Sequence, residues 1–156
     1  MAATGRIYTA NFQNVTIAAA QDLFSIVTPA GRVIALLSLN LGQITGAAIA
    51  NQRVRIQRAA STVVGSGGAT VAGNPWIEND AATTCTIRAN DTVQSVASFT
   101  DLWDDQWNIL NGFLWMPPTI NRPPMIAPSH MFRFSLDGPI ASSVVANGSL
   151  TYEEFP

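Results

Sequence analysis

The residues best suited to chemistry are acidic and lie beside tryptophan. Asp101, Asp104 and Asp105 fall in one short segment, together with Trp103 and Trp107. Paired carboxylates flanked by Trp are typical of a glycosidase cleft or of a sugar-binding site. A solvated acidic turn is the alternative that needs no function. An EF-hand calcium site is excluded, because its ligand spacing is missing.

The chain has one histidine and one cysteine, and neither lies in a catalytic motif. His130 directly follows Ser129, adjacency alone does not build a Ser-His-Asp triad, and no Gly-x-Ser-x-Gly elbow is present. Cys85 alternates in phase with Ile87, which predicts a small buried residue rather than a reactive thiol. A zinc site needs more such ligands. We therefore expect no metal, no cofactor and no enzymatic activity.

A glycine-rich run, Gly65-Ser66-Gly67-Gly68, resembles a phosphate-binding loop only superficially. The Walker pattern requires a lysine at the start of a helix, and this chain contains no lysine. The dinucleotide-binding pattern requires a following helix, and nothing downstream has a helical pattern. The run therefore predicts a flexible hairpin or loop.

Charged residues make up only 12% of the chain, about half the usual share. The surface must consist largely of Ser, Thr, Asn, Gln and Ala, which suits burial in an assembly because a hydroxyl costs far less to bury than a charge. Compositional drift is the alternative explanation. The net charge of −2 argues against nucleic-acid binding. The absence of a signal-peptide profile or a long apolar run argues against a membrane partner.

Two stretches with different patterns organise the chain. The segment from Arg53 to Arg58 alternates strictly, with Val54 and Ile56 on one side and Arg53 and Arg55 on the other. This period of two predicts a strand with one buried face. The segment from Arg32 to Leu41 is apolar on both sides, which indicates a central strand. We expect the two as antiparallel neighbours.

Further strands follow from alternation and turn signals. We expect strands over Asp22–Thr28 and Met131–Leu136, the latter with Arg133 and Ser135 pointing outward, and a weak strand over Val93–Thr100. In the last strand, Ser143–Phe155, Asn147-Gly148 is a hairpin signal. That stretch is either two short strands or one strand with a bulge.

Three other segments have their own signatures. Asp101–Gln106 predicts one helical turn capped by Asp101, and Gln106–Met116 predicts one long strand with a bulge or bend. The prolines of Pro117–Pro128 predict an extended connector.

The total is about eight to ten strands with regularly spaced turns, which is typical of a sandwich or barrel. We predict an all-β protein: a single-domain antiparallel β-sandwich over residues 1–156, jelly-roll-like, with residues 1–12 as an extended N-terminal arm.

Interface cores favour aromatic residues, Met and Arg. The candidate interface residues are Tyr8, Phe12, Trp76, Trp103, Trp107, Arg122 and Met125.

Several short stretches resemble a family of small proteins encoded among the structural genes of tailed bacteriophages. They are Tyr8-Thr9-Ala10-Asn11-Phe12 with Asp22-Leu23-Phe24, Arg53-Val54-Arg55-Ile56 with the glycine-rich run, Gly112-Phe113-Leu114-Trp115-Met116-Pro117-Pro118, and Gly148-Ser149-Leu150-Thr151-Tyr152-Glu153-Glu154. The chain is similar to head-decoration (capsid cement) proteins. The resemblance implies a β-sandwich or jelly roll on the capsid exterior, often oligomeric, and no active site.

Our first hypothesis is a non-enzymatic virion protein that is made in the host cytoplasm and cements the capsid. Its partners would be the major capsid protein and copies of itself. The alternative is a carbohydrate-binding module of a phage tail, with Trp103 or Trp107 exposed beside Asp104 and Asp105. A glycosidase or esterase is the third hypothesis.

Overall fold

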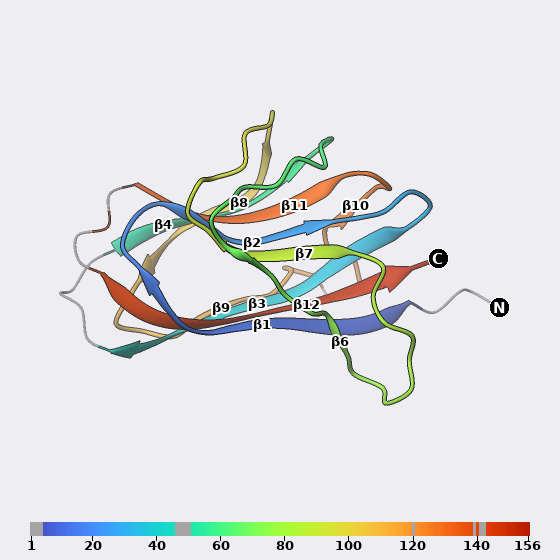
Figure 1. Ribbon diagram of the computed structural model, residues 1–156, viewed down its shortest axis with the longest axis horizontal. Coiled ribbons are helices and arrows are strands. Elements are labelled where there is room, and N and C mark those ends of the chain that lie inside the picture. The colour runs from blue at the N-terminus through green and yellow to red at the C-terminus, as the bar shows by residue number, and fades with distance from the viewer. Residues whose placement is uncertain (1–4, 46–50, 120, 139, 141–142) are drawn as a thin grey trace.

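The computed structural model describes residues 5–45, 51–119, 121–138, 140 and 143–156. These residues form two antiparallel six-stranded sheets packed face to face, with no helix among them (Figure 1). Sheet A has the order β10-β3-β12-β1-β6, with β9 also paired to β3, and sheet B has the order β5-β7-β2-β11-β4-β8. The predicted all-β antiparallel sandwich is confirmed.

The strands have the following bounds: β1 Arg6–Ile17, β2 Gln21–Val27, β3 Val33–Thr45, β4 Asn51–Ala59, β5 Ala69–Thr70, β6 Asn74–Pro75, β7 Thr86–Asp91, β8 Thr100–Asn108, β9 Phe113–Trp115, β10 Met125–Ile126, β11 Met131–Asp137 and β12 Val144–Phe155.

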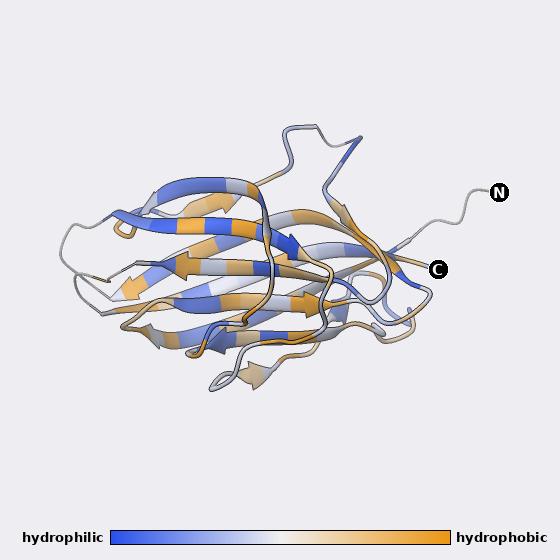
Figure 2. Cartoon of the chain, turned by 90° about the horizontal axis from the view of Figure 1, so that it is seen from above, coloured by the Kyte–Doolittle hydropathy of each residue, from blue (hydrophilic) through white to orange (hydrophobic). Residues whose placement is uncertain are grey.

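Alternating side chains define the two layers, and Figure 2 shows the alternation of hydropathy along the strands. In β4, Val54 and Ile56 face the core and are fully buried. Aromatic rings fill the space between the sheets: Phe24 of sheet B lies 5.2 Å from Phe12 of sheet A, measured between ring centroids. Burial of these side chains supplies the main driving force for folding.

The prediction of an N-terminal arm over residues 1–12 is wrong for residues 6–12, and residues 1–4 lie outside the described residues. Arg6 begins β1, which pairs along its length with β12 and also with β6. Tyr8 stacks on Tyr152 in the core, with 5.5 Å between ring centroids. A central strand with buried aromatic residues cannot reach out to a neighbouring molecule.

The two organising stretches are strands, but they are not neighbours. The first is β3, which pairs with β12, β9 and β10 in sheet A, and the second is β4, which pairs with β11 and β8 in sheet B. The apolar run predicted β3 as a strand, and the alternation predicted β4 together with its buried side. Neither pattern identified the partner strand, because any apolar face fits either layer.

The segment from residue 101 to residue 116 also differs from its prediction. Asp101–Gln106 is part of β8 and not a helical turn. The predicted long strand over Gln106–Met116 is divided: β8 ends at Asn108 in sheet B, a turn follows, and β9 begins at Phe113 in sheet A. The expected bend is therefore a crossing from one sheet to the other.

The insertion between β4 and β8 covers the free edges of both sheets. It contributes β6 beside β1 in sheet A, and β7 and β5 beside β2 in sheet B. The glycine-rich run packs closely on β7, where Gly68 donates its backbone N–H to Asp91 (3.0 Å). Covering an edge strand removes unpaired backbone groups from the surface. The predicted strand Val93–Thr100 contributes one isolated bridge and is otherwise a loop that leads into β8.

The last stretch is the single strand β12, so Asn147-Gly148 makes no hairpin. Gly148 lies against the ring of Phe12, which leaves no room for a side chain. The irregularity is on β1, where Asn14 has a φ of 55° and its backbone N–H donates to Asn147 Oδ1 (2.9 Å). Close packing therefore explains this glycine better than turn formation.

Candidate functional site

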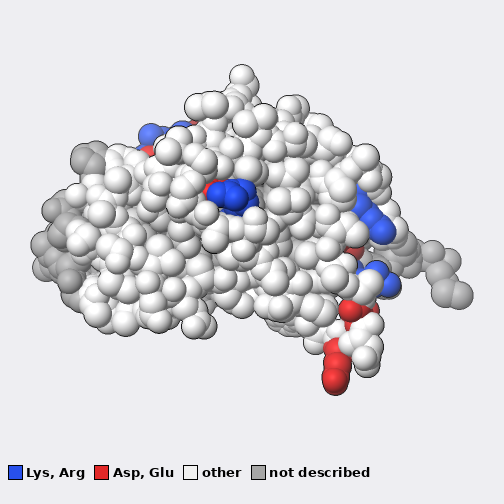
Figure 3. Space-filling view, viewed as in Figure 1, with Lys and Arg blue, Asp and Glu red and all other residues white. Residues whose placement is uncertain are grey.

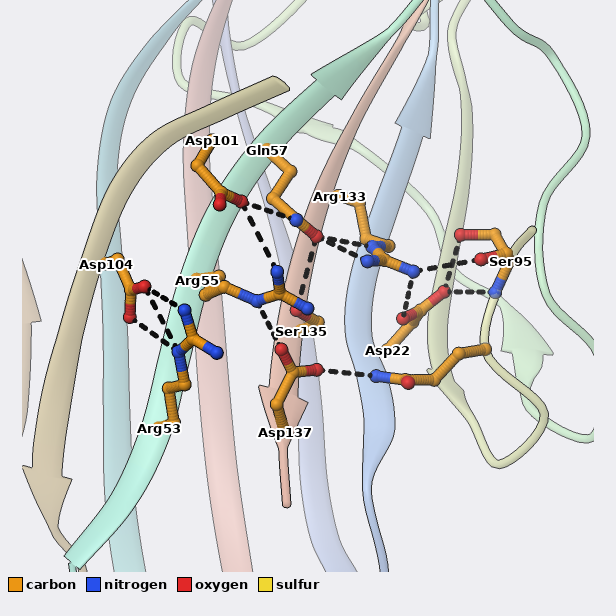
Figure 4. A network of polar contacts seen from close by, with 11 residues as sticks. Asp22, Arg53, Arg55, Gln57, Ser95, Asp101, Asp104, Arg133, Ser135 and Asp137 are labelled. Atoms are coloured by element: carbon orange, nitrogen blue, oxygen red, sulfur yellow. Dashed lines mark hydrogen bonds and ion pairs between the residues drawn. The ribbon is translucent and has the colours of Figure 1, made fainter. Parts of the chain in front are cut away.

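The outer face of sheet B collects half of the chain's charged side chains into one polar layer (Figure 4). The strand register places arginines opposite aspartates on neighbouring strands. The members are Asp22, Arg53, Arg55, Arg88, Asp91, Asp101, Asp104, Arg133 and Asp137. Because most of the charges are paired, this face presents little unbalanced charge to a ligand.

The centre of this layer is closed to solvent. Arg133 donates to Gln57 Oε1 (2.8 Å) and to the backbone oxygen of Ser95 (2.9 Å), and it lies 3.8 Å from the ring centroid of Phe99. Asp22 accepts two hydrogen bonds from Ser95, both 2.8 Å, and lies 3.7 Å from Arg133. Burial raises the pKa of Asp22 and lowers that of Arg133.

The prediction that Arg133 and Ser135 point into solvent is therefore wrong. They do face away from the core, but residues 92–99 fold over them, so both are buried. A pair covered in this way is not open to a substrate, and removing either partner would leave an uncompensated buried charge.

The acidic cluster at β8 differs from the predicted sugar site in the placement of Trp107. Asp104 accepts hydrogen bonds from Arg53, which lower its pKa, and Asp101 accepts one from Gln57. Trp107 faces the core with 2% of its surface exposed and donates to the backbone oxygen of Asn111 (2.7 Å). Trp103 is half-buried against Phe113, with 5.5 Å between centroids. No exposed Trp platform therefore stands beside these carboxylates.

Glu154 and Cys85 form a second buried polar group. Glu154 accepts hydrogen bonds from the Thr83 hydroxyl (2.7 Å) and from the backbone N–H of Thr84 (3.1 Å), and lies 3.8 Å from Cys85 Sγ. Burial, reinforced by Glu154, raises the pKa of Cys85 to about 12. The prediction that Cys85 is buried is confirmed.

His130 lies just before β11 and has no carboxylate partner. Its Nδ1 lies 2.8 Å from the backbone oxygen of Pro128, so Nδ1 carries the proton. Within the described ranges, no three His, Cys, Asp or Glu side chains come together to hold a metal ion.

The outer face of sheet A has the opposite character. One row of outward-facing residues crosses β1, β12, β3 and β9 as Asn11, Ser149, Asn40 and Leu114. The next row is Thr9, Thr151 and Ser38. Among the described residues of this face, the first charged side chain is Glu153, at its end beside Ile7 and Ala35. Figure 3, which views the molecule as in Figure 1 with both sheets in sight, shows the charges of that side gathered in a few small groups.

This face contains a shallow hollow and has apolar margins. The hollow, of about 270 Å³, is lined by Asn11, Asn40 and Ser149 among others. These three side chains make no hydrogen bond to any part of the described chain, so their donors and acceptors are free. Trp76, 65% exposed, stands at one margin and donates through Nε1 to Thr9. Leu114, 64% exposed, stands at the other.

The seven predicted interface residues divide into two groups. Tyr8, Phe12 and Trp107 are buried in the core, so their prediction as surface residues is wrong. Those with surface exposure are Trp76, Trp103, Arg122 and Met125. The amide and hydroxyl rows of sheet A were missed. Their signal was the absence of charge at the outward positions of three long strands.

Comparisons with family models, with curated proteins and with solved structures gave no match. In the part of the chain that the structure describes, no helix is long and apolar enough to cross a membrane. The inference of function therefore depends on the geometry of the two faces.

Proposed function

We propose that this protein is a non-enzymatic structural protein that binds a protein surface through the outer face of sheet A, as a capsid decoration protein of a tailed phage would. The observation that carries the proposal is the lack of charged side chains on that face, among the described residues, from the row of Thr9 to the row of Val145. Its partners would be the capsid shell and further copies of the chain, on the virion exterior.

The energetics of desolvation support this role. Burying a neutral amide or hydroxyl costs little when a partner supplies a hydrogen bond, whereas burying an unpaired charge costs much more. Asn11 and Asn40 each carry a donor and an acceptor, so they can pair with almost any polar surface. Trp76 and Leu114 add apolar area at the margins, as aromatic anchors do in protein interfaces.

The strand order supports the jelly-roll form of the sandwich. The long strands alternate between the layers as β1-β12-β3-β9 in sheet A and β2-β11-β4-β8 in sheet B. Two interleaved Greek keys of this kind occur in viral capsid domains and also in lectins. The fold is therefore compatible with both proposed functions and does not distinguish between them.

The test is co-sedimentation with capsid shells of the encoding phage, assembled and unassembled. A cement protein binds the assembled state and so stabilises it by mass action. We expect the purified chain to pellet with shells, and Asn40→Lys or Ser149→Lys to abolish pelleting. Gln106→Lys, on an exposed position of β8, is the matched control and should pellet normally. Equal pelleting of all four proteins would disprove the role of sheet A.

Light scattering on the same samples gives the oligomeric state. A sharp multiple of the chain mass of 16.6 kDa that is lost in Asn40→Lys indicates that copies associate through the same face. A monomer that still binds shells retains the decoration role and removes self-association from the proposal.

Glycan binding is the second candidate function, because the exposed Trp76 ring donates to Thr9, which lies in the row next to Asn11 of the hollow. Sugar rings stack on Trp and donate to amide oxygens. A glycan array probed with the wild-type chain and with Trp76→Ala tests it. If the array showed no glycan whose binding depends on Trp76, this candidate would be rejected and the first proposal would be unaffected.

A further inference from the structure

One arginine occupies a position that the strand pattern reserves for an apolar residue. Along β4, Val54, Ile56 and Arg58 share one parity. Across β11 they pair with Leu136, Phe134 and Phe132, which are all buried. Arg58 is therefore on the core-facing side of sheet B. It is nevertheless exposed, because it stands at the end of the sandwich where the sheets stop covering each other.

A hollow of about 380 Å³ opens at that end. Sheet B and the segment before β8 contribute Arg58, Ser98 and Thr100, and the segment around β10 contributes Met125 and Ile126. His130 completes the lining. The hollow thus has a polar side, with cationic and hydroxyl donors, and an apolar wall from the other sheet.

The charges of this hollow are unbalanced. Arg58 makes no ion pair or hydrogen bond with any described part of the chain, whereas Arg6, Arg32, Arg53, Arg55, Arg88 and Arg133 each have a carboxylate partner. Among the described residues, no carboxylate lines the hollow. The Nδ1–H of His130 donates to the backbone oxygen of Pro128, so in the neutral imidazole Nε2 carries a lone pair and the donors to an anion are those of Arg58, Ser98 and Thr100.

We infer that this hollow binds a carboxylate carried on a short apolar stem. A guanidinium donates two parallel hydrogen bonds to a carboxylate, and such charge-assisted pairs are stronger than neutral ones. The hydroxyls of Ser98 and Thr100 supply further donors. Met125 and Ile126 give the stem an apolar surface. The carboxylate belongs either to a free aliphatic acid or to an acidic side chain of a protein partner.

The inference is independent of the proposed function, because this hollow shares no lining residue with the hollow on the outer face of sheet A. A failure of either proposal leaves the other standing.

The test uses His130 as a built-in probe, because it is the one histidine of the chain. Its imidazole C–H resonances in a proton NMR spectrum are read while butyrate is titrated into the full chain at constant ionic strength. We expect a saturable shift with butyrate and none with butylamine or butanol, which share the stem but lack the carboxylate.

The matched variants are Arg58→Gln and Arg122→Gln. Arg122 is also exposed, and it lies outside the hollow. We expect Arg58→Gln to weaken butyrate binding about tenfold or more, as loss of a charge-assisted pair requires, and Arg122→Gln to bind normally. An unchanged affinity in Arg58→Gln, or no saturable shift in the wild type, would overturn the inference.

Two further ligands define the chemistry. Inorganic phosphate that binds as tightly as butyrate would also overturn the inference, since the apolar wall would then contribute nothing. A capped Ala-Glu-Ala peptide that displaces butyrate would support a protein side chain as the source of the carboxylate. Failure of the peptide alongside butyrate binding would support a free acid.

Discussion

The two outer faces of this sandwich are built on the same architecture but differ in how far their polar side chains are paired within the chain. Sheet B carries nine charged side chains, paired with each other and partly covered by residues 92–99. Sheet A carries rows of Asn, Ser and Thr that are open and lack intrachain partners at Asn11, Asn40 and Ser149. One face pairs most of its charged groups internally, and the other leaves the amides of Asn11 and Asn40 and the hydroxyl of Ser149 without partners in the described chain.

The difference shows where a partner can bind at low energetic cost. Covering sheet B further would require desolvating ion pairs such as Arg53–Asp104, and that cost often exceeds what the pair returns. Covering sheet A requires only the exchange of water for another neutral donor or acceptor. The charges are thus not spread evenly: half of the chain's charged side chains lie on the outer face of sheet B, whereas the described outward positions of sheet A from Thr9 to Val145 carry none.

The largest effect we predict comes from the buried centre of sheet B. Arg133→Ala leaves the carboxylate of Asp22 buried without its cation and Gln57 without its donor. Loss of one partner from a buried pair costs about 3 to 5 kcal/mol. Urea denaturation followed by tryptophan fluorescence measures it.

Arg53→Ala is the control, since Arg53 also pairs with an aspartate on the same face but is exposed. We expect little change in its free energy of unfolding, because water replaces the lost partner. Equal losses in both variants would show that the covering loop does not exclude water from Arg133.

The next effect concerns the close packing of Gly148 in β12 against the core. Gly148→Ala places a methyl group against the Phe12 ring, which must move within a packed core. Overpacking of this kind costs about 1 to 3 kcal/mol. Gly42→Ala in the neighbouring β3 meets no atom within 4 Å and should be neutral or stabilising by about 0.5 kcal/mol. Thermal unfolding of both variants checks the pair, and a stable Gly148→Ala protein would contradict the packing argument.

The same glycine illustrates how far sequence reasoning extends. Sequence patterns correctly identified β3, β4 and β11 as strands, and alternation identified the buried sides of β4 and β11. Asn147-Gly148 is a strong local turn signal, but the ring of Phe12, far away in the chain, determines the need for glycine. A local pattern can predict which side of a strand is buried, but the strand's neighbours are known only from the assembled fold.

The candidate site was less predictable for a related reason. Aromatic residues were chosen because they favour interfaces, yet Tyr8, Phe12 and Trp107 are equally suited to a core, and the core took them. Arg133 was expected in solvent because charge normally lies there. A loop from another part of the chain supplied its hydrogen bonds, which no pattern around Arg133 reveals.

Acid sensitivity follows from the carboxylates of sheet B. Burial alone raises the pKa of Asp137, but hydrogen bonds from Gln94 and Arg55 lower it below the ordinary value of 3.8. A folded-state pKa below the unfolded one contributes stability above about pH 4, and this contribution is lost as the pH falls through the folded value. Asp22 has the opposite sign, because its pKa is raised.

We therefore expect Asp137→Asn to flatten the loss of stability between about pH 5 and about pH 2. Its stability at neutral pH should fall, since the charge-assisted bond to Arg55 is lost. Urea midpoints at several pH values measure both. An acid limb as steep as that of the wild type would show that other carboxylates determine it.

The smallest effect we predict is on the open face. Asn40→Asp changes an amide into a carboxylate of the same shape, opposite Ser149 and Leu114 and away from every charge in its row. We expect the free energy of unfolding to change by at most about 0.5 kcal/mol, as for most exposed positions. The comparison change on sheet B is Gln57→Leu, which removes the amide oxygen that accepts from the buried Arg133. That variant should lose about 1 to 3 kcal/mol, because a buried donor loses its acceptor. Urea denaturation of both variants makes the comparison. Equal losses would show that the polar groups on the outer face of sheet A are bonded within the chain as fully as those of sheet B. That face would then have no free groups to offer a partner.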